Sequence, residues 1–236
     1  MDKIKFKSGL GQINIPIDDI NIEQFCSFEK LLLEWNEKFN LTAITDNFGI
    51  MTKHFLDSLL PLSAFEVPQN AGIIDVGTGA GFPGIPIKLA RSDLSVTLLD
   101  SLNKRVNFLC EVAAKLDLKE CTPIHGRAEV LGKSAEYREK FDIATSRAVA
   151  SLDMLAEFCL PFVKVGGVFL ALKSEDSEEE TKSAQSIVAA LGGDIENEIT
   201  AKIPYTDIVR KIIIIRKIKN TPAEYPRAMS KIKKKP

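Results

Sequence analysis

The 236-residue chain has few of the residues that build metal sites and disulfide frameworks. It contains two histidines, and its four cysteines form no C-x-x-C pair. We therefore expect no bound metal and four reduced thiols. No stretch approaches the ~20 apolar residues of a membrane span, and the first nine residues lack the apolar core of a signal peptide. These absences predict a cytoplasmic protein that does not cross a membrane.

A large net charge is also missing, because 31 Lys and Arg residues face 32 Asp and Glu residues, for a formal charge of −1. This total hides an asymmetry along the chain. Residues 202–236 hold eleven basic and two acidic side chains, a formal charge of +9, which leaves −10 for the other residues. A basic end of this kind suits an anionic partner, and Tyr225-Pro226-Arg227 adds an aromatic and a rigid residue to it. We interpret the end as a nucleic-acid contact; a merely solubilising tail is the alternative.

From residue 71 onward the sequence alternates between β-rich and helical segments. Such alternation predicts an α/β fold: one doubly wound domain with a mostly parallel sheet covered on both faces. The last β-rich segment contains four consecutive isoleucines, and we expect it to be a central strand that runs antiparallel to its neighbours. The predicted strands are 72–76, 95–99, 122–125, 141–145, 168–172 and 208–215, and the predicted helices are 84–91, 103–116, 152–160 and 181–191.

The N-terminal part lacks this alternation. Apolar residues recur at three- and four-residue steps over residues 20–39, as one face of a helix requires, and a second helix is expected over 48–60. We therefore divide the chain into an N-terminal helical cap (1–65), an α/β domain (66–220) and a basic C-terminal tail (221–236).

A glycine-rich turn, Asp75-Val76-Gly77-Thr78-Gly79-Ala80-Gly81-Phe82-Pro83-Gly84, follows the first predicted strand. Its glycines allow a ligand to approach the backbone closely, and the next helix begins with unpaired N–H groups. The following strand leads to Asp100, at about the ~20-residue distance from which a carboxylate can hold both hydroxyls of a ribose. The pattern predicts an adenosine-containing cofactor at this edge of the sheet.

Two cofactors fit this turn. Gly79-x-Gly81-x-x-Gly84 matches the dinucleotide pattern, which would make the chain a nicotinamide-dependent oxidoreductase. When the count starts at Gly77, however, Phe82 stands where the third glycine should be. Asp75 would repel a pyrophosphate but could orient the positively charged amino end of S-adenosylmethionine. We favour S-adenosylmethionine.

Five ordered motifs carry a resemblance to a known family. The chain resembles the bacterial small-subunit ribosomal RNA methyltransferase G family, also called glucose-inhibited division protein B. The motifs are Trp35-Asn36-x-x-x-Asn40-Leu41-Thr42 with His54-x-x-Asp57-Ser58-Leu59, the loop 75–84, Gly126-Arg127-Ala128-Glu129, Ser146-Arg147-Ala148-Val149-Ala150, and Tyr225-Pro226-Arg227.

The resemblance implies a class I methyltransferase fold with a Rossmann-like seven-stranded sheet, and S-adenosylmethionine as cofactor. It implies methylation of N7 of a guanine in 16S ribosomal RNA near the decoding site, with small-subunit RNA or the 30S particle as partner. The matching positions for cofactor contacts are Gly77, Phe82, Ala128, Glu129 and Arg147. We expect a monomer. A non-catalytic RNA-binding or ribosome assembly factor remains an alternative.

The sequence contains no catalytic group of the kinds that other RNA methyltransferases use. Ser146 and Arg147, rather than an Asn/Asp-Pro-Pro-Tyr motif, follow the fourth predicted strand, and Cys159 lies in an apolar helical run. Guanine N7 has a lone pair and no proton to lose, so direct in-line transfer needs no general base. Arg147 is then a positioning residue. Deletion of the chain after Asn220 is expected to weaken RNA binding and to leave S-adenosylmethionine affinity nearly unchanged.

Overall fold

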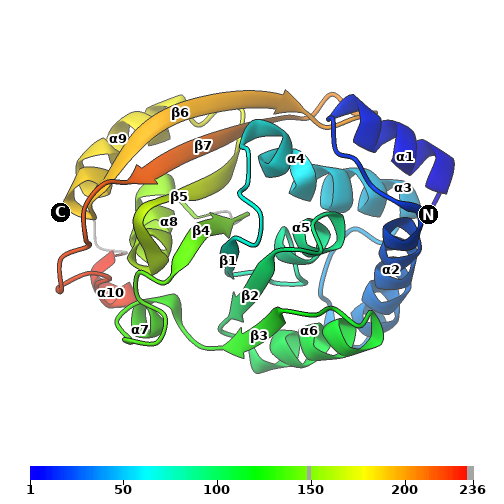
Figure 1. Cartoon of the computed structure of the whole chain (residues 1–236), viewed down its shortest axis with the longest axis horizontal. Coiled ribbons are helices and arrows are strands. Elements are labelled where there is room, and N and C mark those ends of the chain that lie inside the picture. Colours follow the sequence, from blue (N-terminus) through cyan, green and yellow to red (C-terminus); the bar gives the residue numbers. More distant parts are fainter. Residues whose placement is uncertain (148–149, 233–236) are drawn as a thin grey trace.

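The structure, a computed structural model, is built around a seven-stranded sheet with the strand order β3-β2-β1-β4-β5-β7-β6 (Figure 1). It describes residues 1–147 and 150–232. Strands β1 to β5 pair in parallel, whereas β7 is antiparallel to both β5 and β6. The predicted fold class and the antiparallel last strand are confirmed. The strands are β1 (Gly72–Val76), β2 (Ser95–Asp100), β3 (Cys121–His125), β4 (Phe141–Ser146), β5 (Val163–Ser174), β6 (Gly193–Lys202) and β7 (Val209–Lys217).

The four isoleucines of β7 explain why this strand lies inside the sheet. Successive strand residues point to opposite faces. Ile212 and Ile214 accordingly belong to the hydrophobic core on one face, and Ile213 and Ile215 belong to the core on the other. All four are buried. The run is therefore apolar without interruption because both faces of the sheet are covered by helices.

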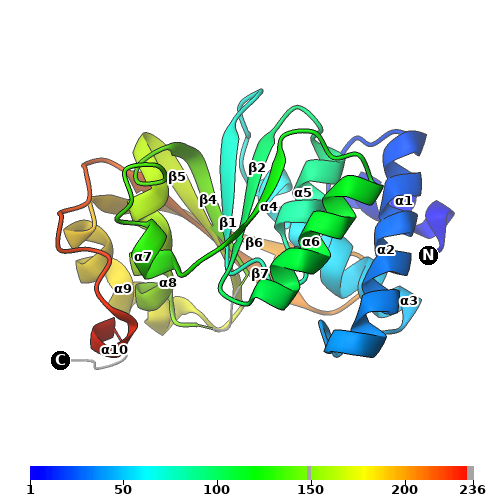
Figure 2. The same ribbon diagram turned by 90° about the horizontal axis from the view of Figure 1, so that it is seen from below.

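Helices form a layer on each side of the sheet (Figure 2). Two of them, α5 and α6, cover one face together with the N-terminal helices, while α8 and α9 cover the other. Their boundaries agree with the predicted helices to within three residues. The helices after β1 are α5 (Gly84–Ala90), α6 (Asn103–Lys115), α7 (Ala128–Leu131), α8 (Leu152–Cys159), the 3₁₀ turn η2 (Leu160–Phe162), α9 (Glu178–Ala190) and α10 (Met229–Ile232).

The N-terminal 65 residues pack onto α5 and α6 and share one hydrophobic core with them. The predicted helix 20–39 is α2, which begins where Asp18 accepts a hydrogen bond from the Asn21 backbone N–H at 2.8 Å. The second predicted helix is interrupted by a seven-residue π-helix. The elements of this part are α1 (Lys3–Gln12), α2 (Asp19–Phe39), α3 (Asn47–Gly49), the π-helix η1 (Ile50–Leu56) and α4 (Asp57–Ala64).

Two of the longer elements, strand β6 and helix α1, were not predicted from the sequence. Edge strand β6 is exposed along most of its length, so it carries polar residues at most positions and lacks a continuous apolar run. Helix α1 buries only Phe6, Gly9 and Leu10, and its other residues are polar or exposed. Neither element has the hydrophobic pattern that marks a strand or helix in a sequence.

Candidate active site at the carboxyl edge of the sheet

A cleft of about 620 Å³ opens where β1, β2 and β4 end. The strand order reverses between β1 and β4, which is where open α/β sheets bind their ligands. Gly77 and Asp100 line the cleft from the ends of β1 and β2, and Ala128 and Glu129 line it from α7. Its volume is that of a small-molecule site. The structure thus brings together four of the predicted site residues.

The glycine loop exposes its backbone to this cleft. Gly77 and Gly79 have φ angles of 73° and 61°, a region that favours glycine, and no atom lies within 4 Å of where a Cβ on either residue would stand. The Gly77 and Thr78 amides donate to the Leu99 carbonyl at 2.9 and 3.1 Å, which ties the loop to the end of β2. The loop therefore leaves room for a ligand beside the backbone.

Asp100 connects the loop to the next helix. Its Oδ2 accepts a hydrogen bond from the Gly79 amide at 2.9 Å and a longer one from Arg105 at 3.4 Å, and its Oδ1 accepts from the Leu102 amide at 2.8 Å. These bonds hold an almost fully buried carboxylate at the floor of the cleft. Its place at the end of β2 is the one predicted for a ribose-binding carboxylate.

Asp75 lies behind the loop and is not among the residues that line the cleft. It is fully buried, and its Oδ2 accepts hydrogen bonds from Thr78 Oγ1 at 2.6 Å and the Gly84 amide at 2.8 Å. Burial raises the pKa of this carboxyl to about 6, against the lowering effect of these hydrogen bonds. Asp75 thus fastens the glycine loop to the start of α5.

Glu129 is mostly buried on α7, and its carboxylate lies 3.6 Å from the guanidinium of exposed Arg127. Ala128 starts the same helix and packs against the hydrophobic core on the face of the sheet that α8 and α9 cover. Both residues follow β3, one strand away from Asp100. Both are predicted cofactor contacts, and both line the cleft.

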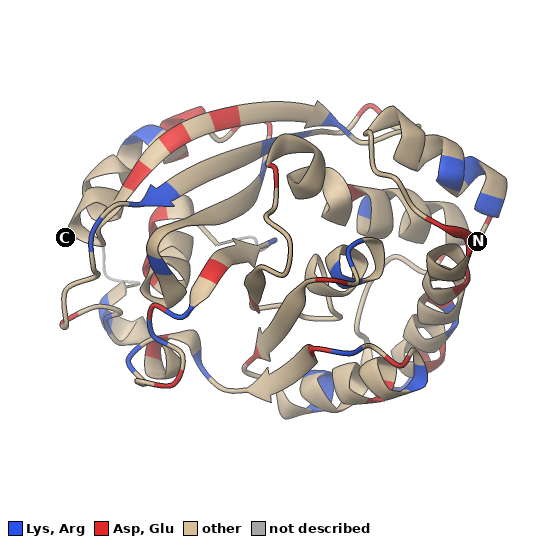
Figure 3. Ribbon diagram, viewed as in Figure 1, with Lys and Arg blue, Asp and Glu red and all other residues tan. Residues whose placement is uncertain are grey.

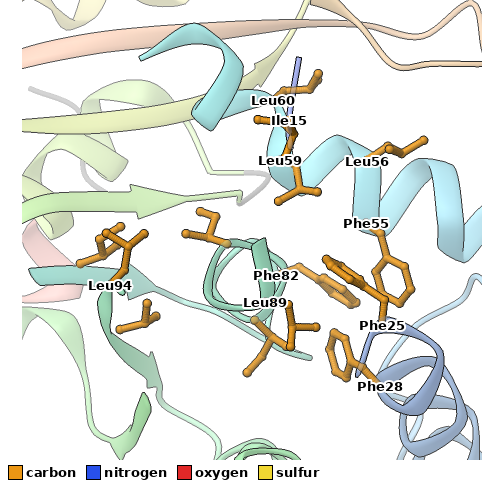
Figure 4. Close-up of a cluster of buried hydrophobic side chains, with 14 of the residues drawn as sticks. Ile15, Phe25, Phe28, Phe55, Leu56, Leu59, Leu60, Phe82, Leu89 and Leu94 are labelled. Atoms are coloured by element: carbon orange, nitrogen blue, oxygen red, sulfur yellow. The ribbon is translucent and has the colours of Figure 1, made fainter. Parts of the chain in front are cut away.

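Phe82 faces the N-terminal helices. Its ring stacks on His54 with the centroids 4.4 Å apart, and it packs against Phe28 at 5.4 Å and Phe55 at 6.2 Å. Figure 4 shows Phe82 and these two phenylalanines together in the buried cluster. The side chain of Phe82 therefore anchors the glycine loop to the N-terminal helices, and Phe82 is not among the residues that line the cleft.

Arg147 also points to the N-terminal helices. Its guanidinium donates to Asp57 Oδ2 at 3.1 Å, to the Lys53 carbonyl at 3.0 Å and to His54 Nδ1 at 3.2 Å. The π-helix η1 presents Lys53 and His54, and Asp57 begins the next helix. Ser146 and Ala150, close to Arg147 in sequence, line the cleft. Arg147 therefore connects the edge of the cleft to the N-terminal helices. Ala148 and Val149 of the same predicted motif lie outside the described residues.

Asp57 lies between two arginines that are far apart in sequence. Besides Arg147 it accepts a hydrogen bond from Arg210 Nε at 2.8 Å, and its side chain is 1% exposed. Asp57 and His54 belong to a motif that carried the family resemblance, but no role was predicted for them. His54 is buried and stacks on Phe82. Nothing in the local sequence around Arg210 indicated this partner.

Most of the described basic side chains of the C-terminal region form ion pairs. Six of the eight basic side chains described between residues 202 and 232 lie within 4.0 Å of a carboxylate, and five of those carboxylates precede residue 202. Figure 3 shows blue and red segments side by side along β6 and β7. Among the described residues, most of the basic charge that the sequence concentrates after residue 202 therefore lies beside carboxylates in space. The final lysines, 233–235, lie outside the described residues. The pairs are Lys202–Asp207, Arg210–Asp57, Lys211–Glu198, Arg216–Glu196, Lys217–Glu139 and Arg227–Glu157.

Within residues 1–147 and 150–232, no group of three or more His, Cys, Asp or Glu side chains is arranged to hold a metal ion. In the same residues, no helix combines the length and apolar character needed to cross a bilayer.

The sheet order, the antiparallel β7 and the glycine loop at the switch point define the class of protein: a class I S-adenosylmethionine-dependent methyltransferase. Solved structures share this fold. Aeropyrum pernix fibrillarin with natively bound S-adenosyl-L-methionine superposes with a TM-score of 0.52 at 17% identity, covering 68% of this chain and 73% of that one. M. jannaschii TYW2 in complex with AdoMet gives 0.53 at 18% identity, covering 66% and 73%.

The family follows from sequence comparison. A family model described as rRNA small subunit methyltransferase G matches residues 21–203. The proteins called Ribosomal RNA small subunit methyltransferase G of Alkaliphilus oremlandii and Clostridium botulinum are 48% and 47% identical, each over 230 residues, 98% of this chain and 96% of their own length. The chain belongs to the rRNA small subunit methyltransferase G family, and its cofactor is S-adenosylmethionine. The predicted family and cofactor are confirmed.

The cleft fits this cofactor. The open space beside Gly77 and Gly79 would accommodate a ligand against the backbone, and Asp100, which lines the cleft, would supply acceptor oxygens for a ribose. Apolar side chains of α8, among them Leu155 and Phe158, line the cleft and can contact a purine ring. When bound, S-adenosylmethionine supplies an electrophilic methyl group on a positively charged sulfur.

Proposed function

We propose that this enzyme transfers a methyl group from S-adenosylmethionine to N7 of a guanine in small-subunit ribosomal RNA, near the decoding site. The names of its relatives support ribosomal RNA of the small subunit as the substrate. The enzyme would act as a monomer in the cytoplasm, on the 30S particle or on its RNA.

The proposal for N7 is carried by the chemistry of the cleft lining. Among the described lining residues the only ionisable side chains are Asp100, Arg105, Arg127 and Glu129. Asp100 already accepts three hydrogen bonds, and Glu129 lies beside Arg127, so neither is a free base. An exocyclic amine would have to lose a proton during the reaction, whereas N7 reacts through an in-plane lone pair. A cleft that only positions the reactants suits N7.

We assign the predicted residues to two groups. Gly77, Asp100, Ala128 and Glu129 would contact the cofactor, because they line the cleft. The remaining four would position the first group: Asp75 and Phe82 by fastening the glycine loop, Gly79 through its hydrogen bond to Asp100, and Arg147 by holding the end of β4 against the N-terminal helices.

RNA must present the guanine in an accessible form. The N7 edge is hidden in the deep major groove of A-form RNA, so the target would lie in a loop or be extruded. Arg105 and Arg127 line the cleft with 35% and 70% of their side chains exposed, and Lys231 is exposed on α10. These basic side chains could contact phosphates around the cleft. They take the place of Lys202, Arg210, Lys211, Arg216, Lys217 and Arg227 as proposed contacts, because none of these six lines the cleft.

The test uses labelled S-adenosylmethionine with 30S particles, and separately with bare RNA, from cells that lack this protein. We expect the RNA to become labelled, and we expect chemical cleavage at 7-methylguanine to release this label. Label on an amine or a pyrimidine carbon would overturn the N7 assignment, and no label in either substrate would leave a non-catalytic binding role. A D100A variant, which loses the ribose acceptor, is the inactive control, and K219A, at an exposed position away from the cleft, is the active one.

A further inference from the structure

We infer that residues 221–232, here called the C-terminal strap, form one wall of the S-adenosylmethionine site, with Met229 as a cofactor-contacting residue. Met229 lines the cleft together with Met154 and Phe158 of α8. It begins α10, the last helix of the described chain, and packs against the core on that face of the sheet. In Figure 1 α10 lies beside α7 and α8, the helices that supply the rest of this wall.

The first anchor of the strap is an ion pair outside the cleft. Glu157 of α8 is buried, with 1% of its side chain exposed. It accepts hydrogen bonds from Arg227 through Nε at 2.9 Å, through NH2 at 2.7 Å and through the Arg227 backbone N–H at 2.7 Å. A bidentate pair with an additional backbone bond fixes both position and orientation. Arg227 thereby holds Met229, two residues further on, against α8.

The second anchor joins the strap to α7. Arg138 donates hydrogen bonds to the strap carbonyls of Tyr225 at 2.9 Å and Thr221 at 2.6 Å, and to the carbonyl of Gly132 at 2.8 Å. Gly132 follows α7 directly, and a Cβ at this position would lie 3.2 Å from Pro226 Cγ. The strap therefore packs closely onto α7, the helix that begins with the proposed cofactor contacts Ala128 and Glu129.

These anchors make the strap part of the binding site rather than a free tail. Met229 adds a flexible, polarisable side chain to a wall that is already apolar through Leu155 and Phe158. Such a wall suits a purine ring. The exposed Lys231 follows Met229 by two residues, so a phosphate bound there would act on the same short segment. RNA binding and cofactor binding would then be linked, and each would change the affinity for the other by the same factor.

This inference conflicts with the expectation that deletion after Asn220 leaves S-adenosylmethionine affinity unchanged. It rests on the cofactor and not on the target atom of the proposed function. A binding measurement without RNA can therefore fail independently of the N7 proposal.

The experiment is calorimetric titration of S-adenosylmethionine into the full chain and its variants without RNA. We expect M229A to raise Kd roughly tenfold, as the loss of one well-packed apolar contact would. R227A, which changes no residue of the cleft lining, should raise Kd severalfold, and M229L should restore most of the affinity. K219A, on the neighbouring exposed surface, should bind like the wild type.

The double variant R227A/M229A distinguishes an effect transmitted through the strap from a general loss of structure. If Arg227 acts through Met229, R227A should add little to M229A, because the two residues act as one unit. Kd values of M229A and R227A within twofold of wild type would overturn the inference. Independent, additive effects of the two substitutions would also overturn it. Near-ultraviolet circular dichroism verifies that each variant is folded. If R227A is not folded, the Kd of M229A alone tests the inference.

Discussion

The position of Asp57 between Arg147 and Arg210 leads to a strong prediction about stability. Asp57→Asn keeps the size and shape of the side chain, so it creates no cavity, but it removes the negative charge that both guanidiniums share. The variant would leave two positive charges close together inside the protein without a counter-charge. Asparagine can still accept one hydrogen bond through its amide oxygen.

The size of the effect follows from burial. Removal of one partner of a buried ion pair costs about 3–5 kcal/mol. The side chains of Arg147 and Arg210 are 17% and 26% exposed, so water can relieve part of the repulsion. We therefore expect the lower limit, roughly 3 kcal/mol of unfolding free energy, which for a chain of this size lowers the Tm by roughly 6–12 °C.

Urea unfolding monitored by circular dichroism measures the difference directly. Asp207→Asn is the matched control, because it removes a fully exposed carboxylate that is paired with Lys202, and it should leave the urea midpoint nearly unchanged. Arg210→Met in the Asp57→Asn background should recover part of the loss by removing one of the unbalanced charges. An Asp57→Asn variant within about 1 kcal/mol of wild type would refute the reasoning.

Three other predictions concern pH, packing and thiol chemistry. Burial, reinforced by the charge of Arg147, lowers the pKa of His54 to about 4, so the folded state resists protonation of this residue. Relative to H54N, the free energy of unfolding of the wild type should fall by about 1.4 kcal/mol for each pH unit between pH 6.5 and 4, as measured by urea unfolding. A pH-independent difference between the two proteins would contradict this. Gly84→Ala would place a Cβ 2.3 Å from a buried leucine side chain and should cost about 1–3 kcal/mol in thermal unfolding, whereas Gly11→Ala, with no atom within 4 Å, should be neutral or stabilising; equal effects would argue against the packing. Exposed Cys110 should react with a thiol reagent in the native protein, while Cys159, whose pKa is raised far above its usual value by complete burial, should react only on unfolding; rapid labelling of a C110S variant at Cys159 would disprove this.

Much of the fold was predictable because its signals are local. Buried strands need apolar runs and covering helices need apolar faces, so six of the seven strands could be recognised from short windows. Strand β6 was missed because an edge strand needs little burial. The cleft itself was also predictable in part: Gly77 and Asp100 stand where the first two strands end, and parallel strands place their carboxyl ends at one edge of the sheet.

The directions of individual side chains were less predictable. Phe82 and Arg147 belong to cleft motifs, yet both side chains face the N-terminal helices, because Phe28, His54 and Asp57 offer them partners there. The position of Met229 in the cleft likewise depends on the anchoring of Arg227, far from the cofactor loop in sequence.

The sequence by itself determined the fold class, the family and the cofactor, since strand pattern and loop chemistry are carried by neighbouring residues. Only the tertiary structure decided where the charges go. Arg210 meets Asp57 across 153 positions and Arg227 meets Glu157 across 70, so six of the eight basic side chains described between residues 202 and 232 are paired in space. Burial favours such pairing, because an isolated charge taken out of water costs far more than one with a counter-charge beside it.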